Sequence, residues 1–121
     1  MEALKYETIK NGVTGSTVRE LIGAGRLRRS DVQMVIPART LERRLSGDQV
    51  LKINEADAIA RLVRIRDHAL RVFEREDVSE EWLSLPNPAL GGEVPIEMAS
   101  TDIGGREVEA VLGRIEHGVY G

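Results

Sequence analysis

Cysteine is absent from this chain of 121 residues, and aromatic residues make up only 3% of it. Without cysteine the chain has no disulfide framework, no thiolate zinc site and no cysteine nucleophile, which suits a reducing compartment. The scarcity of aromatic side chains leaves core packing to leucine, isoleucine, valine and long flexible side chains. The composition therefore indicates a globular protein with an aliphatic core.

Long apolar runs are missing as well. No stretch approaches the roughly 20 apolar residues of a membrane-spanning helix, and the first residues lack the apolar segment of a signal peptide. We therefore expect a soluble, cytoplasmic protein with no membrane partner. The length is enough for one domain, or for two small domains that share a core.

Residue patterns that carry chemistry are also missing. No nucleophile stands at a useful spacing from a base, and no acidic or histidine cluster has the spacing of a metal site. His68 is a lone histidine among apolar residues, which favours a structural role. The pair Gly91-Gly92 lacks the preceding strand and the following Lys-Ser/Thr of a phosphate loop. We expect no enzyme activity, no metal and no cofactor.

The charge of the chain is distributed unevenly. Residues 1–53 contain ten Lys/Arg and six Asp/Glu, a balance of +4, whereas residues 54–121 contain seven and fourteen, a balance of −7. A basic front half is compatible with nucleic acid and an acidic back half with a basic partner. Such an imbalance is also common on solvated surfaces, so neither interpretation is excluded.

The front of the chain predicts short helices after a loose or strand-like arm over residues 1–14. Thr17 begins an S/T-x-x-E capping box, and the helix that it starts should end near residues 23–25. Ser30 is expected to cap a second short helix, with Asp31 near its positively charged end.

A third short helix is expected over residues 37–45, where Pro37 suits the first turn. Leu41 and Leu45 define its apolar side. Its polar side carries the candidate DNA-binding residues Arg39, Thr40, Arg43 and Arg44. Two short helices in tandem, the second rich in arginine, are the outline of a helix-turn-helix motif. A short amphipathic helix with a solvated basic face explains the same residues, and both interpretations stay open.

Asn54 is expected to cap the longest helix, with Glu55 and Asp57 in its first turn. Its apolar residues recur at helical spacing and comprise Ile59, Leu62, Val63, Ile65, Leu70, Val72 and Phe73. This surface is broad enough to pack against both halves of the chain. The expected architecture is therefore all-α, with a long central helix that joins two helical parts.

The last third predicts short elements around a loop. Asp77 or Ser79 is expected to cap a helix that carries Trp82 and Leu83, while residues 85–92 contain too many Pro, Asn and Gly for helix or strand. A helical turn should follow over residues 95–98. The last helix is expected over residues 106–116, with Gly104-Gly105 before it. Its apolar stripe comprises Val108, Val111, Leu112 and Ile115.

Together these residues resemble a known family. The C-terminal block is similar to the toxin-binding domain of the Xre/MbcA/ParS antitoxins in the order of its Trp, Pro, Gly and apolar positions. The similar positions are Trp82-Leu83, Pro86-Asn87, Ala89-Leu90-Gly91-Gly92, Pro95, Gly105, Val108 and residues 112–120. Residues 36–44 resemble the Xre-type helix-turn-helix of the same proteins. The resemblance covers about residues 15–121.

The resemblance implies three parts: an N-terminal arm over residues 1–14, an Xre-like helix-turn-helix and dimerisation domain over 15–76, and a toxin-binding domain with a C-terminal plug over 77–121. It implies an antitoxin that pairs with a RES-domain toxin and whose N-terminal domain forms a homodimer or binds the operator DNA of its own operon. Toxins of that family degrade NAD or transfer its ADP-ribose to a protein. The antitoxin's C-terminal end lies in the toxin's active-site cleft and blocks substrate entry.

The resemblance assigns toxin binding to Trp82, Leu83, Arg114, Glu116, His117, Gly118, Val119, Tyr120 and Gly121. Small residues in this tail have little side-chain entropy to lose in a cleft, and Tyr120 adds buried area and a hydroxyl. Carboxylates at Glu116 and Gly121 suit a cleft whose basic groups hold a pyrophosphate. From the residues alone, a frayed terminus is the favoured explanation of the tail, and the resemblance favours the plug instead. The second hypothesis is a helix-turn-helix transcriptional regulator whose C-terminal half only oligomerises.

Overall fold

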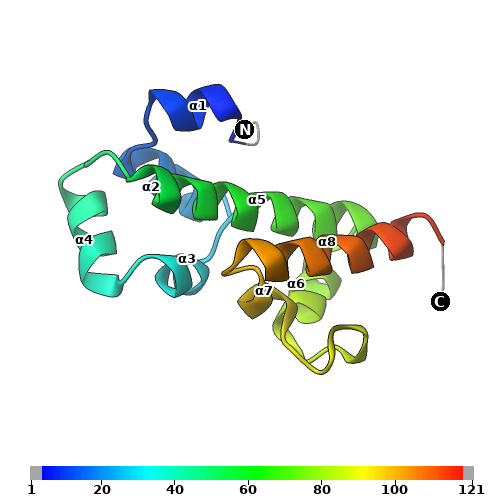
Figure 1. The fold of residues 1–121 in the computed structure, drawn as a ribbon. Helices are drawn as coiled ribbons and strands as arrows, with labels where there is room; N and C mark the ends of the chain where they lie inside the picture. Colours follow the sequence, from blue (N-terminus) through cyan, green and yellow to red (C-terminus); the bar gives the residue numbers. More distant parts are fainter. Residues whose placement is uncertain (1–3, 119–121) are drawn as a thin grey trace. The chain divides into compact units, whose positions relative to one another are not determined.

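The computed structural model describes residues 4–118, and these residues form α-helices and one 3-10 turn but no β-strand (Figure 1). The elements are α1 (Tyr6–Asn11), α2 (Gly15–Gly23), α3 (Arg29–Val35), α4 (Ala38–Ser46), α5 (Ile53–Phe73), α6 (Glu76–Ser84), η1 (Pro88–Leu90), α7 (Pro95–Met98) and α8 (Asp102–Glu116). The prediction of an all-α fold is confirmed. No helix within the described part of the chain has the length and hydropathy needed to cross a membrane.

The chain divides into two units, residues 1–63 and residues 64–121, and α5 runs from the first into the second. The long helix predicted from the apolar periodicity is therefore the element that both units share. The predicted domain boundary between residues 76 and 77 stays a prediction.

In the first unit α2 packs closely against α4, because Gly15 has no side chain. A Cβ at Gly15 would overlap the backbone carbonyl of Arg44, and the Gly15 N–H donates to the Gln49 carbonyl at 3.0 Å. The buried aliphatic side chains of this unit are Val13, Val18, Leu21, Leu27, Val32, Ile36, Leu41, Leu45, Leu51, Ala56, Ala58, Ile59, Leu62 and Val63. Aliphatic packing thus builds this core, as the composition predicts.

The prediction of a loose or strand-like arm over residues 1–14 is wrong for Tyr6–Asn11, which forms α1. This helix buries none of its side chains, so it leaves no apolar periodicity in the sequence. Thr14 is strand-like, because it forms an isolated antiparallel bridge with Val50.

The predicted N-caps are wrong at Thr17, Ser30 and Asn54. Each of these residues lies within a helix that begins one or two residues earlier. At the starts of α3 and α5 the acidic residue of the first turn makes the capping contact instead: Asp31 accepts from the Arg28 N–H at 3.2 Å, and Glu55 from the Lys52 N–H at 2.9 Å. The starts of α3 and α5 are therefore marked in the sequence by Asp31 and Glu55, and not by the preceding residues Ser30 and Asn54.

The predicted tandem of short helices is confirmed as α3 and α4, with Leu41 and Leu45 buried. On α5 the predicted apolar stripe is correct up to Ile65, but Leu70 is 40% exposed. Small residues take core positions that the periodicity did not predict, namely Ala56, Ala58 and Ala69.

The second unit contains the C-terminal part of α5 with α6, η1, α7 and α8. Its buried aliphatic side chains are Ile65, Ala69, Leu83, Leu90, Ile96, Ala99, Val108, Val111 and Leu112. Two ion pairs tie α5 to its neighbours at 2.6 Å each, one from Arg66 to Glu80 of α6 and one from Arg64 to Glu109 of α8. The second unit therefore has an aliphatic core with ion pairs along one of its helices.

The boundaries around the loop follow local hydrogen bonds. α6 begins at Glu76, so the predicted caps Asp77 and Ser79 are wrong. Residues 85–92 are not entirely irregular, because the Asn87 Oδ1 accepts from the Ala89 N–H at 2.9 Å and starts η1. Gly91 and Gly92, with φ of 67° and 84°, then turn the chain. The predicted helical turn over residues 95–98 is confirmed as α7.

The prediction that the last helix begins at residue 106 is wrong, because α8 begins at Asp102 and includes Gly104. Thr101 caps it, since the Thr101 Oγ1 accepts from the Gly104 N–H at 3.0 Å. A Cβ at Gly104 would overlap the backbone carbonyl of Met98. This glycine allows α8 to approach the end of α7 and does not break the helix.

Candidate functional site

The end of α8 brings several predicted toxin-binding residues together. The His117 N–H donates to the Gly113 carbonyl at 3.0 Å, and the Gly118 N–H donates to the Ile115 carbonyl at 3.1 Å. Gly118 has a φ of 70°, the left-handed conformation with which glycine commonly ends a helix. Arg114, His117 and Gly118 are exposed. The chain therefore leaves α8 at a defined turn with exposed side chains around it.

The remaining predicted tail residues, Val119, Tyr120 and Gly121, lie outside the described residues. Gly118 is therefore the last residue of the predicted tail that the structure describes.

Glu116 is held by two side chains of α5. Its Oε1 lies 3.1 Å from the His68 Nε2, and its Oε2 accepts from the Arg71 Nε at 3.1 Å. The hydrogen bonds from Arg71 and His68 hold the pKa of the Glu116 carboxyl below its usual range. Both carboxylate oxygens are thus engaged within the second unit. No local sequence pattern predicts this contact, because 45 residues or more separate Glu116 from its partners.

The two predicted toxin-binding residues of α6 have different surroundings. The Trp82 ring lies 5.6 Å from the Phe73 ring between centroids, at a tilt of 42°, and is half-buried. Leu83 is fully buried in the core. Of the two, Trp82 is the residue with surface that a partner can touch.

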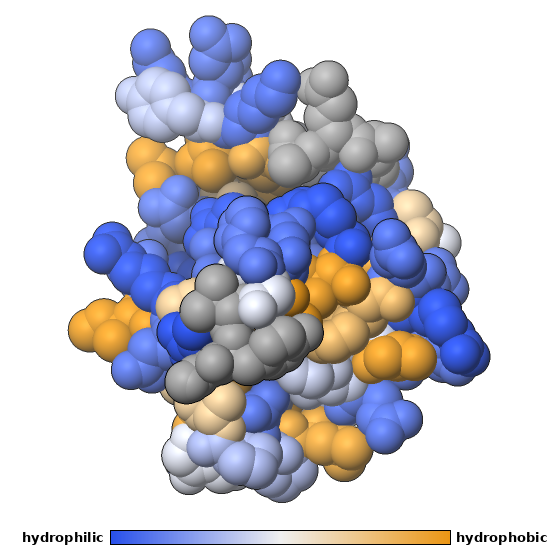
Figure 2. All heavy atoms as spheres, turned by 90° about the vertical axis from the view of Figure 1, so that its right-hand side faces the viewer, coloured by the Kyte–Doolittle hydropathy of each residue, from blue (hydrophilic) through white to orange (hydrophobic). Residues whose placement is uncertain are grey.

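Exposed apolar side chains elsewhere in the second unit were not predicted as contacts. Leu85 is 51% exposed and Ile103 is 75% exposed. Figure 2 shows one face on which hydrophilic side chains predominate and apolar ones form separate patches. Single exposed apolar residues are common on protein surfaces, so the sequence alone gave these two no role.

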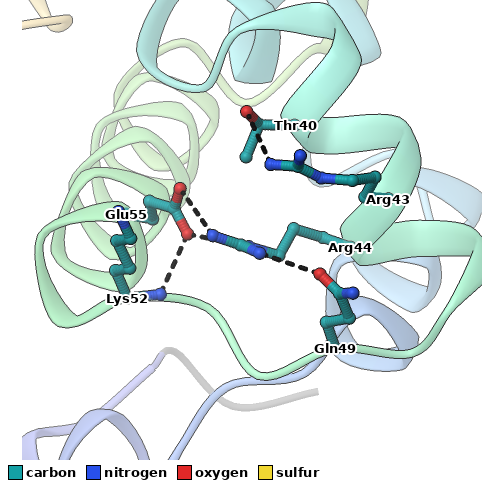
Figure 3. A network of polar contacts seen from close by, with 6 residues as sticks. All are labelled: Thr40, Arg43, Arg44, Gln49, Lys52 and Glu55. Atoms are coloured by element: carbon teal, nitrogen blue, oxygen red, sulfur yellow. Dashed lines mark hydrogen bonds and ion pairs between the residues drawn. The ribbon is translucent and has the colours of Figure 1, made fainter.

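The predicted DNA-binding residues of α4 do not share one environment. Arg39 and Arg43 are exposed, and the Thr40 hydroxyl accepts from the Arg43 Nη2 at 3.4 Å. Arg44 points toward Glu55 of α5 (Figure 3), and its side chain is only 12% exposed. Its guanidinium donates to both Glu55 oxygens at 3.1 and 3.4 Å, and to the Gln49 Oε1 at 2.8 Å. Arg44 therefore fixes α4 to α5, whereas Arg39 and Arg43 face solvent.

Burial raises the pKa of Glu55, but hydrogen bonds from Arg44 and from the Lys52 N–H outweigh it and lower the pKa below its usual range. Because the folded-state pKa is lower than the unfolded one, the stabilisation is complete above about pH 4.3 and is lost as the pH falls below it. Within residues 4–118 no group of three or more His, Asp or Glu side chains is arranged to hold a metal ion.

Replacing Glu55 by glutamine should lower the free energy of unfolding at pH 7 by about 1–3 kcal/mol, because Arg44 loses its charged acceptor. The variant should also lose less stability than the wild type between pH 7 and pH 3, because the stabilisation by Glu55 is lost below about pH 4.3. Urea denaturation at the two pH values measures both effects, with Glu20→Gln, at an exposed position of α2, as the control. Equal losses in the two variants at pH 7 would contradict the role given to Glu55.

Comparison with known proteins identifies the family. Residues 68–118 match the domain described as the antitoxin Xre/MbcA/ParS C-terminal toxin-binding domain. Antitoxin Xre of Pseudomonas putida is 33% identical over 116 residues, which cover 96% of this chain and 72% of that protein. Antitoxin Xre of Photorhabdus laumondii is 38% identical over 85 residues, which cover 69% of this chain and 57% of that protein. Antitoxin Xre of Yersinia enterocolitica is 37% identical over 86 residues, which cover 70% and 58%.

The chain belongs to the Xre antitoxin family, and the family resemblance found in the sequence is confirmed. It spans between 57% and 72% of the length of these three relatives.

Proposed function

We propose that this chain binds a RES-domain toxin and occludes the active site in which the toxin holds NAD. The observation that carries the proposal is the match of residues 68–118 to a toxin-binding domain. This match ends at Gly118, where the chain turns out of α8. The toxin degrades NAD or transfers its ADP-ribose to a protein, and an occluded cleft prevents either reaction.

The proposed contacts begin at the end of α8. Arg114, His117 and Gly118 provide the exposed rim, and residues 119–121 enter the cleft. Small side chains lose little rotamer entropy on binding, so most of the contact energy is retained. Tyr120 supplies the large, amphipathic side chain that interface centres favour. Trp82 adds the exposed part of its ring as a second anchor.

Charge supports the same partner. Residues 54–121 carry a balance of −7, and a cleft that binds the pyrophosphate of NAD has to be basic. Complementary charge accelerates encounter and orients the partners, and it weakens at high salt. The acidic half of the chain is therefore suited to associate rapidly with a basic cleft.

Co-expression with a tagged RES-domain toxin tests this proposal. The untagged chain should co-purify with the toxin, and Trp82→Ala should weaken the complex about tenfold because a half-buried aromatic anchor is lost. Val78→Ala, a 38% exposed position on the same helix, should leave affinity unchanged. A toxin that purifies without the chain would contradict the proposal.

A second candidate function, autorepression through operator DNA, is favoured by the exposure of Arg39 and Arg43 on α4. Four-residue spacing places both guanidinium groups on one side of the helix, where they can contact phosphates or base edges. Dimerisation of the chain would place two such helices on a symmetric operator. Sedimentation measures that oligomeric state directly.

The double change Arg39→Ala and Arg43→Ala should weaken operator binding and lower the slope of log affinity against log salt by about 2, because two phosphate contacts are lost. Toxin binding should be unaffected. The control is Lys10→Ala with Arg106→Ala, which removes the same charge elsewhere. An operator affinity that falls equally in both double variants would mean that only total charge matters.

A further inference from the structure

Glu116 occupies a position where a carboxylate is unfavourable unless it is paired. It is the last residue of α8, and the carbonyl end of a helix carries partial negative charge. The contacts of its two oxygens with His68 and Arg71 compensate this, and both partners belong to α5. The His68 side chain is 14% exposed, so this contact is partly shielded from water.

The last turn of α8 has few other attachments. Leu112 is the last fully buried side chain of the helix, and Ile115 is half-buried. Gly113 has no side chain, and Arg114 is exposed. Helix ends open readily when they lack packing. Among the residues that the structure describes, the contacts of Glu116 with His68 and Arg71 are therefore the main polar attachment of the turn that precedes Gly118.

On the basis of the proposed function, we propose that Glu116 is a positioning residue for toxin binding. Its contacts with His68 and Arg71 fix the last turn of α8, so that His117 and Gly118 direct the following residues into the toxin from a fixed point. Glu116 itself makes no contact with the toxin. This differs from the direct toxin contact that the family resemblance implies for Glu116.

A fixed exit point raises affinity by lowering the entropy lost when the tail binds. A fraying last turn would spread the tail over many directions, and only a fraction of the molecules would then be ready to bind. The contribution of Glu116 should consequently depend on Arg71, although Arg71 lies on a different helix. A direct toxin contact would show no such dependence.

A double-mutant cycle of Glu116 and Arg71, with toxin affinity as the measured quantity, distinguishes a positioning role of Glu116 from a direct contact with the toxin. Glu116→Ala and Arg71→Ala should each weaken binding about tenfold, and the double variant should be no weaker than Glu116→Ala. The exchanged pair, Arg71→Glu with Glu116→Arg, should recover affinity to within about threefold, because it restores the ion pair between α5 and α8. Asp102→Ala with Arg106→Ala, which removes an exposed ion pair of 3.0 Å on the same helix, is the control and should have no effect.

The proposal would be overturned if Arg71→Ala left toxin affinity unchanged, or if the losses of affinity in the two single variants added up in the double variant. Glu116 would then belong to the toxin interface. Hydrogen exchange of the free chain gives an independent test. The amides of His117 and Gly118 should exchange about tenfold faster in Glu116→Ala, because their hydrogen bonds close the last turn. Unchanged exchange would also overturn it. If the wild-type chain fails to bind the toxin, the proposed function is contradicted, and the exchange rates alone decide about Glu116.

Discussion

Replacing Gly104 by alanine is expected to lower the free energy of unfolding by about 3 kcal/mol. Inside a helix, alanine normally stabilises by roughly 1 kcal/mol relative to glycine. Here the added Cβ would overlap the backbone carbonyl of Met98, which cannot move as a flexible side chain could. Relief of the overlap would separate α8 from the end of α7 and disturb the Thr101 cap. The predicted sign is therefore opposite to the usual one.

Gly113→Ala is the matched control, since Gly113 lies on the same helix and a Cβ there meets no atom within 4 Å. This variant should gain about 0.5–1 kcal/mol. Urea denaturation followed by circular dichroism measures both variants. If Gly104→Ala is as stable as Gly113→Ala, the close approach of α8 to Met98 is not a determinant of the fold.

The same glycines explain why part of the fold could not be predicted from the sequence. Gly104 and Gly105 were interpreted as residues before a helix, and they lie within α8. Gly15 was given no role, although it allows α2 to contact α4. In each case the glycine is required by a neighbouring backbone, and sequence patterns do not show which backbone will be near.

Periodicity predicted what depends on local order. Leu41 and Leu45 correctly predicted the buried side of α4. The apolar residues between positions 59 and 65 correctly predicted the buried side of α5. In both helices the helical repeat alone decides which side is apolar. It failed at Leu70, whose exposure depends on what packs near the end of α5. α1 was not predicted, since a helix without buried side chains has no apolar repeat.

The candidate sites were predicted in part for the same reason. The sequence located the arginines of α4 and the end of α8, but it treated Arg44 and Glu116 as surface residues ready for a partner. Both make charged contacts within their own unit, with Glu55 in one case and with His68 and Arg71 in the other. Long-range pairs of this kind follow from the packing of helices and not from the spacing of residues.

Removing residues 119–121 should abolish inhibition of the toxin while leaving the fold intact. The shortened chain retains Gly118, so the hydrogen bond from its N–H to the Ile115 carbonyl, 3.1 Å long, can still close α8. Its free energy of unfolding should change by less than about 0.5 kcal/mol, as for surface changes. Toxin binding should weaken, because Tyr120 and the small residues beside it are lost.

Occlusion of the active site is tested by measuring NAD consumption by the purified toxin, once with the full chain and once with the chain that lacks residues 119–121. We expect the full chain to inhibit the toxin, with more NAD required to overcome the inhibition as the chain concentration rises. The shortened chain should inhibit at least about a hundredfold more weakly. Equal inhibition by the two chains would contradict occlusion of the active site by the tail.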